Sequence, residues 1–265
     1  MKKIRLDVLL VSRNLAPSRE RAQAHIMAGD VFVAGQRALK PGQAVPEDAI
    51  VELRGEKMPY VSRGGKKLAR ALEVFPISPA GQCCIDCGAS TGGFTDCLLQ
   101  NGARFVYAVD VGYGQLDYRL RTDPRVSVME RTNIRHLTPQ DLDEPPSFAT
   151  MDLSFISLGL ILPVITQLLT ESGQAICLIK PQFEAGREHV GKKGVVRDPH
   201  IHEMVLNRFI QQAEDADFTV LGLDHSPIRG PEGNIEYLAY IAKGDVAKPP
   251  HLDIQETVAH AQESL

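Results

Sequence analysis

The fold of this chain follows from one segment, Asp86-Cys-Gly-Ala-Ser-Thr-Gly-Gly-Phe94. The segment follows the apolar run Cys83–Cys87 and precedes a helical pattern over Phe94–Gln100, so it is typical of a turn at the end of a strand. Its glycines let the backbone turn tightly and approach a ligand closely. The turn therefore predicts a ligand site at the carboxyl edge of an α/β sheet. A plain strand-to-helix connection is the alternative.

A second feature narrows the choice of ligand. Asp110 ends the next apolar run, and a carboxylate at that place can accept hydrogen bonds from both hydroxyls of a ribose. The glycine segment has neither the G-x-G-x-x-G spacing of dinucleotide sites nor the G-K-[ST] ending of phosphate-binding loops. A ligand with ribose and adenine but no phosphate fits both facts. The pattern indicates the methyl donor S-adenosylmethionine.

Short apolar runs alternate with helical patterns after Pro79. This alternation predicts an α/β fold, a Rossmann-like and mostly parallel sheet wrapped by helices. The last two runs have no long helix between them, so we expect an antiparallel last strand, joined to its neighbour by the loop 226–234. The predicted strands are Cys83–Cys87, Phe105–Asp110, Phe148–Asp152, Ala175–Lys180, Val220–Leu223 and Tyr237–Ala242, and the predicted helices are Phe94–Gln100, Ile156–Leu169 and Pro199–Ala213.

The N-terminal part has a different pattern. Ser18 is placed to cap a helix over Arg19–Ala28 that stops at Gly29, and Ile50–Leu53 is typical of a strand. These features predict a small α/β module with little core of its own. We therefore expect a head over 1–54, a linker over 55–61, an α/β domain over 62–244 and a polar, peripheral tail over 245–265.

Charge is unevenly distributed along the chain. From Met1 to Phe75 there are 14 Lys and Arg against 8 Asp and Glu, whereas the remainder has 15 against 25. A basic head on an acidic body favours a polyanionic partner for the head, and a solvated basic surface is the alternative.

Other features of the sequence exclude several classes of protein. No segment approaches the roughly 18 apolar residues of a membrane span, and the first residues do not form a signal peptide. We expect a cytoplasmic protein that does not bind a membrane. Cys84 and Cys87 form a lone C-x-x-C without further ligands at suitable spacing, so no metal is expected.

Charged residues follow two of the predicted strands. Asp152 ends one strand and Lys180 ends another, so both lie at the ligand edge of the sheet. Glu236 opens the last strand, and Lys67 precedes the first helix of the domain. A lysine at this edge can accept the proton of a ribose hydroxyl if a carboxylate orients it and a second cation lies nearby. A solvated strand-end lysine is the alternative.

The motifs taken together resemble the TlyA family, which is named both for hemolysin A and for ribosomal RNA 2'-O-methyltransferase activity. The head resembles an S-four-type RNA-binding domain and the body an FtsJ-like methyltransferase domain. The motifs that carry the resemblance are Arg5-Leu-Asp7, Ser18-Arg19, Gly29-Asp-Val-Phe-Val33, Tyr60-Val-Ser-Arg-Gly-Gly-Lys-Lys-Leu68, Asp86–Thr95, Met151-Asp-Leu-Ser-Phe155, Lys180-Pro-Gln-Phe-Glu184 and Gly233-Asn-Ile-Glu236.

The resemblance implies three groups of site residues. The implied catalytic tetrad is Lys67, Asp152, Lys180 and Glu236, with Lys66 as the alternative to Lys67. The implied donor contacts are Asp86, Gly88, Ala89, Ser90, Thr91, Gly92, Gly93, Phe94, Asp110, Asn133 and Asp152. The implied RNA contacts are Arg5, Arg19, Arg21, Arg63, Arg187, Lys192 and Lys193. The last three lie in a segment that ends at Arg197, and this segment is either a second RNA-binding region or a flexible loop.

The function that these features predict is transfer of a methyl group from S-adenosylmethionine to a ribose 2'-hydroxyl of ribosomal RNA. The expected partners are ribosomal RNA or ribosomal subunits, and no oligomeric state follows from the sequence. Two alternatives remain at this point: a hemolysin-type membrane-active protein, and an RNA-binding factor that keeps the fold without catalysis.

Overall fold

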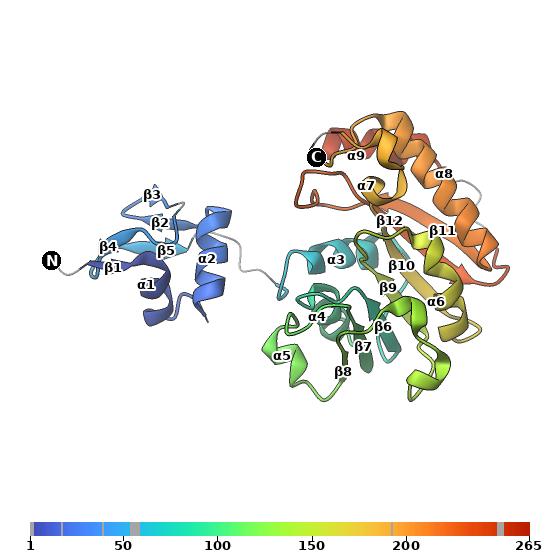
Figure 1. Ribbon diagram of the computed structural model, residues 1–265, viewed down its shortest axis with the longest axis horizontal. Coiled ribbons are helices and arrows are strands. Elements are labelled where there is room, and N and C mark those ends of the chain that lie inside the picture. The colour runs from blue at the N-terminus through green and yellow to red at the C-terminus, as the bar shows by residue number, and fades with distance from the viewer. Residues whose placement is uncertain (1–2, 17, 39, 54–58, 192, 248–251) are drawn as a thin grey trace. The chain divides into compact units, whose positions relative to one another are not determined.

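The computed structural model describes residues 3–16, 18–38, 40–53, 59–191, 193–247 and 252–265. The chain divides into two compact units, Met1–Pro59 and Tyr60–Leu265, which Figure 1 shows as a blue unit and a larger unit coloured from cyan to red. The first unit contains the predicted head and the second contains the predicted α/β domain. The exact boundaries of the linker and tail stay a prediction.

The larger unit is built on a seven-stranded sheet with the order β11-β12-β10-β9-β6-β7-β8. Only β12 runs against its neighbours, since it pairs antiparallel with both β10 and β11, whereas the other pairs are parallel. The predicted parallel sheet with an antiparallel last strand is confirmed. The strands are β6 Cys83–Cys87, β7 Phe105–Val109, β8 Val126–Met129, β9 Phe148–Met151, β10 Gln174–Ile179, β11 Phe218–His225 and β12 Tyr237–Lys243.

Helices cover both faces of this sheet because its strands carry apolar side chains on both faces. On one face, Ile165, Phe209 and Val258 pack on the strands from α6, α8 and α9. On the other face, Leu68 and Leu98 pack from α3 and α4. The helices are α3 Gly64–Val74, α4 Gly93–Gln100, α5 Tyr118–Arg121, α6 Leu162–Leu168, α7 Pro181–Glu184, α8 Pro199–Asp215 and α9 Ile254–Ser264.

Local sequence explains several of these boundaries. The side chain of Asp198 accepts a hydrogen bond from His200 N and caps α8, with Pro199 at the first helical position as expected. The helix predicted over Ile156–Leu169 begins later, at Leu162, because the preceding residues form a loop and a short 3-10 turn over Leu158–Leu160. Strand β8 is a short, half-buried strand at the sheet edge that the apolar pattern does not reveal.

The C-terminal residues differ from the expected peripheral tail. Ile254–Ser264 forms α9, which packs against α8 and β11. Val258 and Ala261 are buried there, three positions apart on one face of the helix. The overall polarity of the tail hides this short apolar stripe.

The smaller unit contains two helices and two small sheets. Leu6, Leu10, Ile26 and Val31 form its core, and Ser18 Oγ accepts a hydrogen bond from Arg21 N at the start of α2, as predicted. Its elements are β1 Lys3–Arg5, α1 Leu6–Ser12, α2 Arg19–Ala28, β2 Val31–Val33, β3 Gln36–Arg37, β4 Ala44–Pro46 and β5 Val51–Leu53, with β1 paired to β4 and the order β3-β2-β5 in the second sheet.

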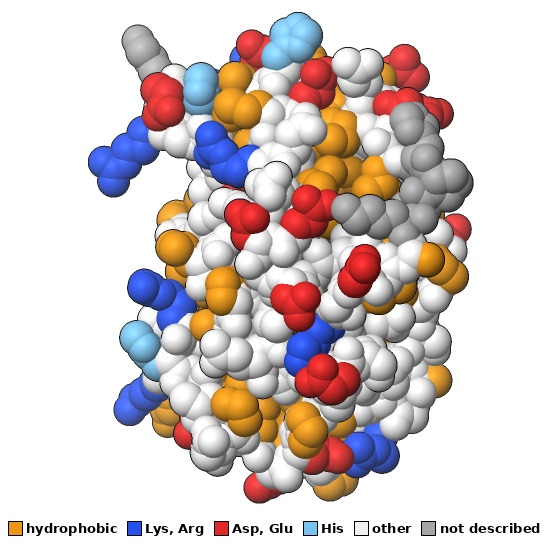
Figure 2. Space-filling model, turned by 90° about the vertical axis from the view of Figure 1, so that its right-hand side faces the viewer, with side chains coloured by type: hydrophobic (Ala, Val, Ile, Leu, Met, Phe, Trp, Pro, Cys, Tyr) orange, Lys and Arg blue, Asp and Glu red, His pale blue; other side chains and the backbone are white. Residues whose placement is uncertain are grey.

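The acidic excess of the body is visible on its surface. Figure 2, which views the molecule from the right-hand side of Figure 1, shows acidic side chains spread among apolar and basic ones on that face.

Candidate active site

The glycine segment links the end of β6 to the start of α4. Gly88 has a φ of +88° and Gly92 a φ of +96°, a region that favours glycine. A Cβ atom at position 88 would lie 2.5 Å from the backbone oxygen of Asp152. The turn therefore requires glycine there, and it brings the backbone against the end of β9.

A cavity of about 440 Å³ opens beside this turn. Asp110 is fixed at its wall, because Oδ2 accepts a hydrogen bond from Ser90 N at 2.8 Å and Oδ1 accepts one from Gly112 N at 2.6 Å. Each carboxylate oxygen can accept a further hydrogen bond. The cavity is lined by Gly88, Ser90, Val109, Asp110, Val111, Gln115, Thr132, Asn133, Ile134, Asp152, Leu153, Ser154, Phe155 and Ile156.

The lining fits the methyl donor. Its apolar residues offer a flat surface for adenine, Asp110 offers acceptors for a ribose, and Asp152 offers negative charge for a sulfonium or an amino group. The close approach of Gly88 to Asp152 keeps the floor of the cavity free of a side chain. The residues present are therefore suited to S-adenosylmethionine.

The predicted donor residues fall into two sets. Five of them line the cavity: Gly88, Ser90, Asp110, Asn133 and Asp152. The others, all within the described part of the chain, do not line it: Asp86, Ala89, Thr91, Gly92, Gly93 and Phe94. They shape the turn instead, since a Cβ on Gly92 would collide with Leu120 and a Cβ on Gly93 with Ser62. Phe94 is buried in the core below the turn.

Asp86 has a structural position below the cavity. It is completely buried, and it accepts hydrogen bonds from Thr95 Oγ1 at 2.7 Å and Thr150 Oγ1 at 2.9 Å. Burial raises the pKa of Asp86 to about 6, against the hydrogen bonds from the two threonines, which lower it. These hydrogen bonds connect β6 to β9 and α4, and each of them occupies one oxygen of the Asp86 carboxyl group.

The predicted tetrad is present as two ion pairs. Lys180 Nζ lies 2.6 Å from Asp152 Oδ1 and donates a hydrogen bond to Ser154 Oγ at 3.0 Å. Lys67 Nζ donates to Glu236 Oε2 at 2.5 Å. All four side chains are buried or half-buried, so each ammonium group needs its carboxylate.

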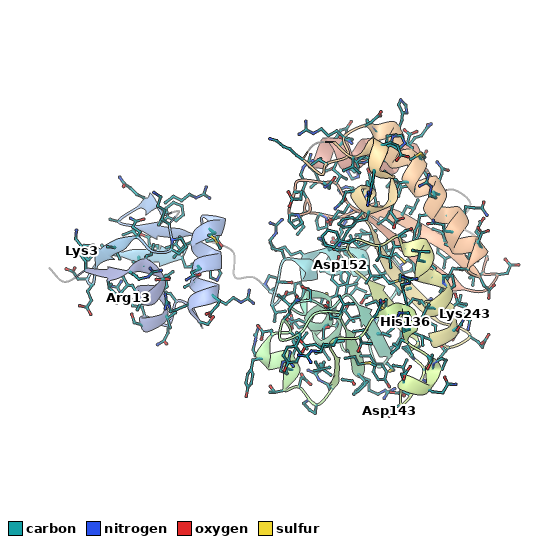
Figure 3. All side chains as sticks on the ribbon, in the orientation of Figure 1. Lys3, Arg13, His136, Asp143, Asp152 and Lys243 are labelled. Atoms are coloured by element: carbon teal, nitrogen blue, oxygen red, sulfur yellow. The ribbon has the colours of Figure 1, made fainter. Side chains whose placement is uncertain are left out.

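Four elements position these groups. Lys180 directly follows β10, Asp152 directly follows β9, Glu236 directly precedes β12, and Lys67 lies in the first turns of α3. A Cβ on Gly64, at the start of α3, would lie 3.9 Å from Asp152 Oδ2, so the helix that carries Lys67 begins beside the Lys180–Asp152 pair. Figure 3 shows Asp152 within the larger unit, where the sheet meets α3. Lys67, rather than Lys66, makes the ion pair to Glu236.

The predicted RNA-contact residues belong to both units of the chain. In the smaller unit, Arg5 and Arg19 both bind Asp7, at 2.8 and 3.2 Å, and the hydrogen bond from Arg5 is the main reason why the pKa of Asp7 lies well below its usual range. Arg21 follows in the first turn of α2, and its side chain is half-buried. Arg5 and Arg19 are thus organised around a buried carboxylate, that of Asp7.

The remaining RNA-contact candidates are in the larger unit. Arg63 is exposed and donates a hydrogen bond to the backbone oxygen of Arg229 at 3.1 Å. Arg187 and Lys193 are exposed in the segment after α7, and Lys192 lies outside the described residues. Asn234, two residues before Glu236, holds this segment by accepting from Val196 N and donating to Gly194 O.

Sequence reasoning missed residues beside the cavity. Ser154 binds Lys180, and the side chain of Phe155 is 90% exposed with a φ of +64°. Glu184 is buried and accepts hydrogen bonds from Ser157 Oγ at 2.7 Å and Leu158 N at 2.8 Å. Their only signal in the sequence is adjacency to strand-end residues, since Ser154 and Phe155 follow Asp152 and Glu184 follows Lys180.

Comparison with known families agrees with this geometry. The model of the FtsJ-like methyltransferase family matches residues 60–243, and the model of the S4 domain matches residues 4–51. The fold and site thus define an FtsJ-like methyltransferase preceded by an S4 domain, and S-adenosylmethionine is the methyl donor of this class. Within it, the chain belongs to the TlyA family.

The relatives support that assignment over nearly the whole chain. The Bacillus subtilis protein YqxC is 51% identical over 100% of this chain and 96% of its own length. The 16S/23S rRNA (cytidine-2'-O)-methyltransferase TlyA of Mycobacterium tuberculosis is 44% identical over 91% and 90%. A solved structure from Streptococcus thermophilus, named as a candidate hemolysin, has a TM-score of 0.80 at 49% identity and covers 100% of this chain and 97% of that one.

One relative, from Brachyspira hyodysenteriae, is named hemolysin A and is 43% identical over 89% of this chain and 99% of its own length. In the described part of this chain, none of the helices has the length and apolarity needed to cross a membrane.

Proposed function

We propose that this protein is an S-adenosylmethionine-dependent methyltransferase that modifies a ribose 2'-hydroxyl of ribosomal RNA. The observation that carries the proposal is the ion pair between Lys180 and Asp152, because Asp152 also lines the donor cavity. A reacting hydroxyl next to Lys180 would therefore lie next to the donor as well.

S-adenosylmethionine, when bound, supplies an activated methyl group at its sulfonium centre. The protein's own residues then have two tasks, to align the ribose and to receive the proton of its 2'-hydroxyl. We assign the proton to Lys180 Nζ, which Asp152 and Ser154 orient. Lys67 and Glu236 hold the neighbouring end of α3 and the start of β12, and they line the approach of the ribose.

The choice of acceptor rests on the relatives and on the head. Relatives from Mycobacterium tuberculosis and Campylobacter jejuni are named as rRNA (cytidine-2'-O)-methyltransferases. The S4 domain over residues 4–51 carries Arg5, Arg19 and Arg21, and arginine side chains of this kind hold RNA phosphates. We extend the proposal to cytidine as the modified nucleoside, to assembled ribosomal subunits as substrates and to the cytoplasm as the place of action.

The test is a methyl-transfer assay with labelled donor on rRNA and on ribosomal subunits from cells that lack the gene. Resistance to alkaline cleavage maps the modified riboses. We expect Lys180→Ala and Lys67→Ala to lose activity by about 10²–10⁴-fold while still binding the donor, and Lys66→Ala, one position away on the same helix, to keep most of it.

Two results would contradict the proposal. Full activity of Lys180→Ala would exclude the assigned proton acceptor. A protein that binds RNA but shows no affinity for the donor by calorimetry, with or without RNA, would instead be a non-catalytic RNA-binding factor. Leakage of liposomes caused by the purified protein would support the membrane-active alternative.

A further inference from the structure

A second group of ligand-type side chains lies where α9 crosses the edge strand β11. Asp224 and His225 are the last two residues of β11, and His260 is on α9. One ligand atom from each lies within 4.8 Å of the other two. The rings of His225 and His260 are 4.9 Å apart and nearly perpendicular. None of these residues belongs to the methyl-transfer site.

The hydrogen bonding of His225 leaves one of its two ring nitrogens free. Its Nδ1 lies 3.0 Å from the backbone oxygen of Ser226, and because a carbonyl oxygen only accepts, Nδ1 carries the proton. Nε2 is then left with its lone pair. This atom is buried, the residue is only 6% exposed, and among the described residues Nε2 has no hydrogen-bond partner. A buried, unpartnered ring nitrogen is costly unless something binds it.

The same arrangement is the usual support of a metal-binding histidine. Such a histidine donates its second ring N–H to a carbonyl or carboxylate, which fixes the tautomer. Asp224 is supported in the same way, since Oδ2 accepts a hydrogen bond from Arg70 Nε at 2.8 Å and Oδ1 remains for a ligand. Two imidazoles and one carboxylate form a ligand set typical of zinc, and here His225 and Asp224 are each oriented by a supporting hydrogen bond.

We propose that Asp224, His225 and His260 bind a divalent transition metal of the zinc type, which fastens α9 to the edge of the sheet. Tetrahedral zinc at about 2.1 Å from each ligand atom requires those atoms to lie about 3.4 Å apart. The present spacing of up to 4.8 Å has to close by up to about 1.4 Å, and His260 can supply this movement because its side chain is exposed. Asp224 and His260 line a groove of about 640 Å³ together with Glu256 and Glu263. The two glutamates share the His260 face of α9, so either can complete the set.

The site would act on the fold close to the active residues. Ser226, next to His225, donates a backbone hydrogen bond to Glu236 O at 2.8 Å, and Arg70 lies on the helix that carries Lys67. A metal here would therefore stabilise the β11–β12 end and α9 without entering the donor cavity.

The test uses the full chain without an affinity tag, stripped with EDTA and then given Zn²⁺ or Co²⁺. Native mass spectrometry should show one Zn²⁺ per chain, Co²⁺ should give the visible absorption of a tetrahedral site, and Zn²⁺ should raise the Tm in a way that EDTA reverses. His260→Gln should weaken metal affinity by at least about tenfold, since even loss of a supporting contact costs that much.

His200→Gln is the matched control, because His200 is an exposed histidine on α8 with a glutamate three residues later, as His260 is on α9. It should bind metal like the wild type. His260 is exposed, so its variant is expected to fold, and circular dichroism checks this. No bound metal in the wild type, or equal binding by wild type and His260→Gln, would overturn the proposal and leave an ordinary histidine pair.

Discussion

Lys180 and Asp152 form an ion pair at 2.6 Å between the ends of two neighbouring parallel strands, β10 and β9. Asp152 also lines the donor cavity, so its carboxylate faces both Lys180 and the methyl donor. A change at Asp152 should therefore affect both kcat and donor affinity, whereas a change at Lys180 should affect only kcat.

We expect Asp152→Ala to lower kcat by about 10²–10⁴-fold and also to weaken donor binding. Steady-state kinetics gives the first effect and calorimetry with S-adenosylmethionine the second. Asp143→Ala is the control, since Asp143 is an exposed carboxylate that Figure 3 shows away from Asp152. Wild-type donor affinity in Asp152→Ala would contradict the double role.

Phe155 provides the second prediction. Its ring is 90% exposed at the mouth of the donor cavity, its φ is +64°, and its centroid lies 5.0 Å from that of Phe183. An exposed aromatic ring held at such a cost in backbone strain is suited to stack on a nucleobase. Stacking on a protein ring contributes about 1–3 kcal/mol per base.

Phe155→Ala should therefore raise KM for RNA by roughly 5- to 150-fold, the range that this energy corresponds to, with a smaller effect on donor affinity. Phe155→Tyr should restore most of the lost affinity because it keeps the ring. Equal losses for RNA and donor would instead indicate that Phe155 only shapes the cavity.

How much of this site the sequence reveals depends on where each residue lies. Asp152 and Lys180 were predictable because parallel strands bring their carboxyl ends to one edge, and both residues end apolar runs. The partnership of Lys67 with Glu236 was not, since one lies on a helix and the other opens the antiparallel strand. The need of a catalytic lysine for a second cation and for orienting carboxylates suggested that the four residues converge, but it did not assign Glu236 to Lys67.

The misplaced start of α6 has a specific cause. The apolar pattern from Ile156 onward is compatible with a helix, but the carboxylate of Glu184 takes up the Ser157 hydroxyl and the Leu158 amide. A partner 26 residues further along the chain cannot be read from local periodicity. The loop that lines the donor cavity exists because of this long-range contact.

Glu184 itself leads to a third prediction. Its burial raises the pKa of its carboxyl group, and its two hydrogen bonds hold the loop that carries Ser154 and Phe155. Glu184→Ala leaves a buried amide and a hydroxyl without an acceptor, which costs about 1–3 kcal/mol. The loop should loosen and donor affinity should fall.

Calorimetry measures the donor affinity, and hydrogen exchange of the peptide covering 153–161 measures how far the loop has loosened. Glu184→Gln should recover part of the donor affinity because its amide oxygen still accepts a hydrogen bond. Glu188→Ala, an exposed glutamate four residues later, is the control and should behave like the wild type. Unchanged exchange in Glu184→Ala would argue against a positioning role.

The last prediction concerns the buried carboxyl group beneath the glycine turn. Burial raises the pKa of Asp86 to about 6, from 3.8 for an aspartate in the unfolded chain. Between these two values the unfolded chain has lost this proton while the folded chain keeps it. The contribution of Asp86 to the free energy of unfolding is therefore fully present below pH 3.8, and it is lost as the pH rises through about 6.

Asp86→Asn cannot ionise, so it should lack this pH dependence. The free energy of unfolding of the wild type, minus that of Asp86→Asn, should fall by up to about 3 kcal/mol between pH 4 and 7. Urea titrations followed by circular dichroism measure it, since the chain has no Trp for fluorescence. Taking the difference between the wild type and Asp86→Asn removes the contribution of the other carboxylates that titrate in this range. A difference that rises with pH would mean that Asp86 is ionised in the folded protein throughout, with the hydroxyls of Thr95 and Thr150 outweighing the cost of its burial.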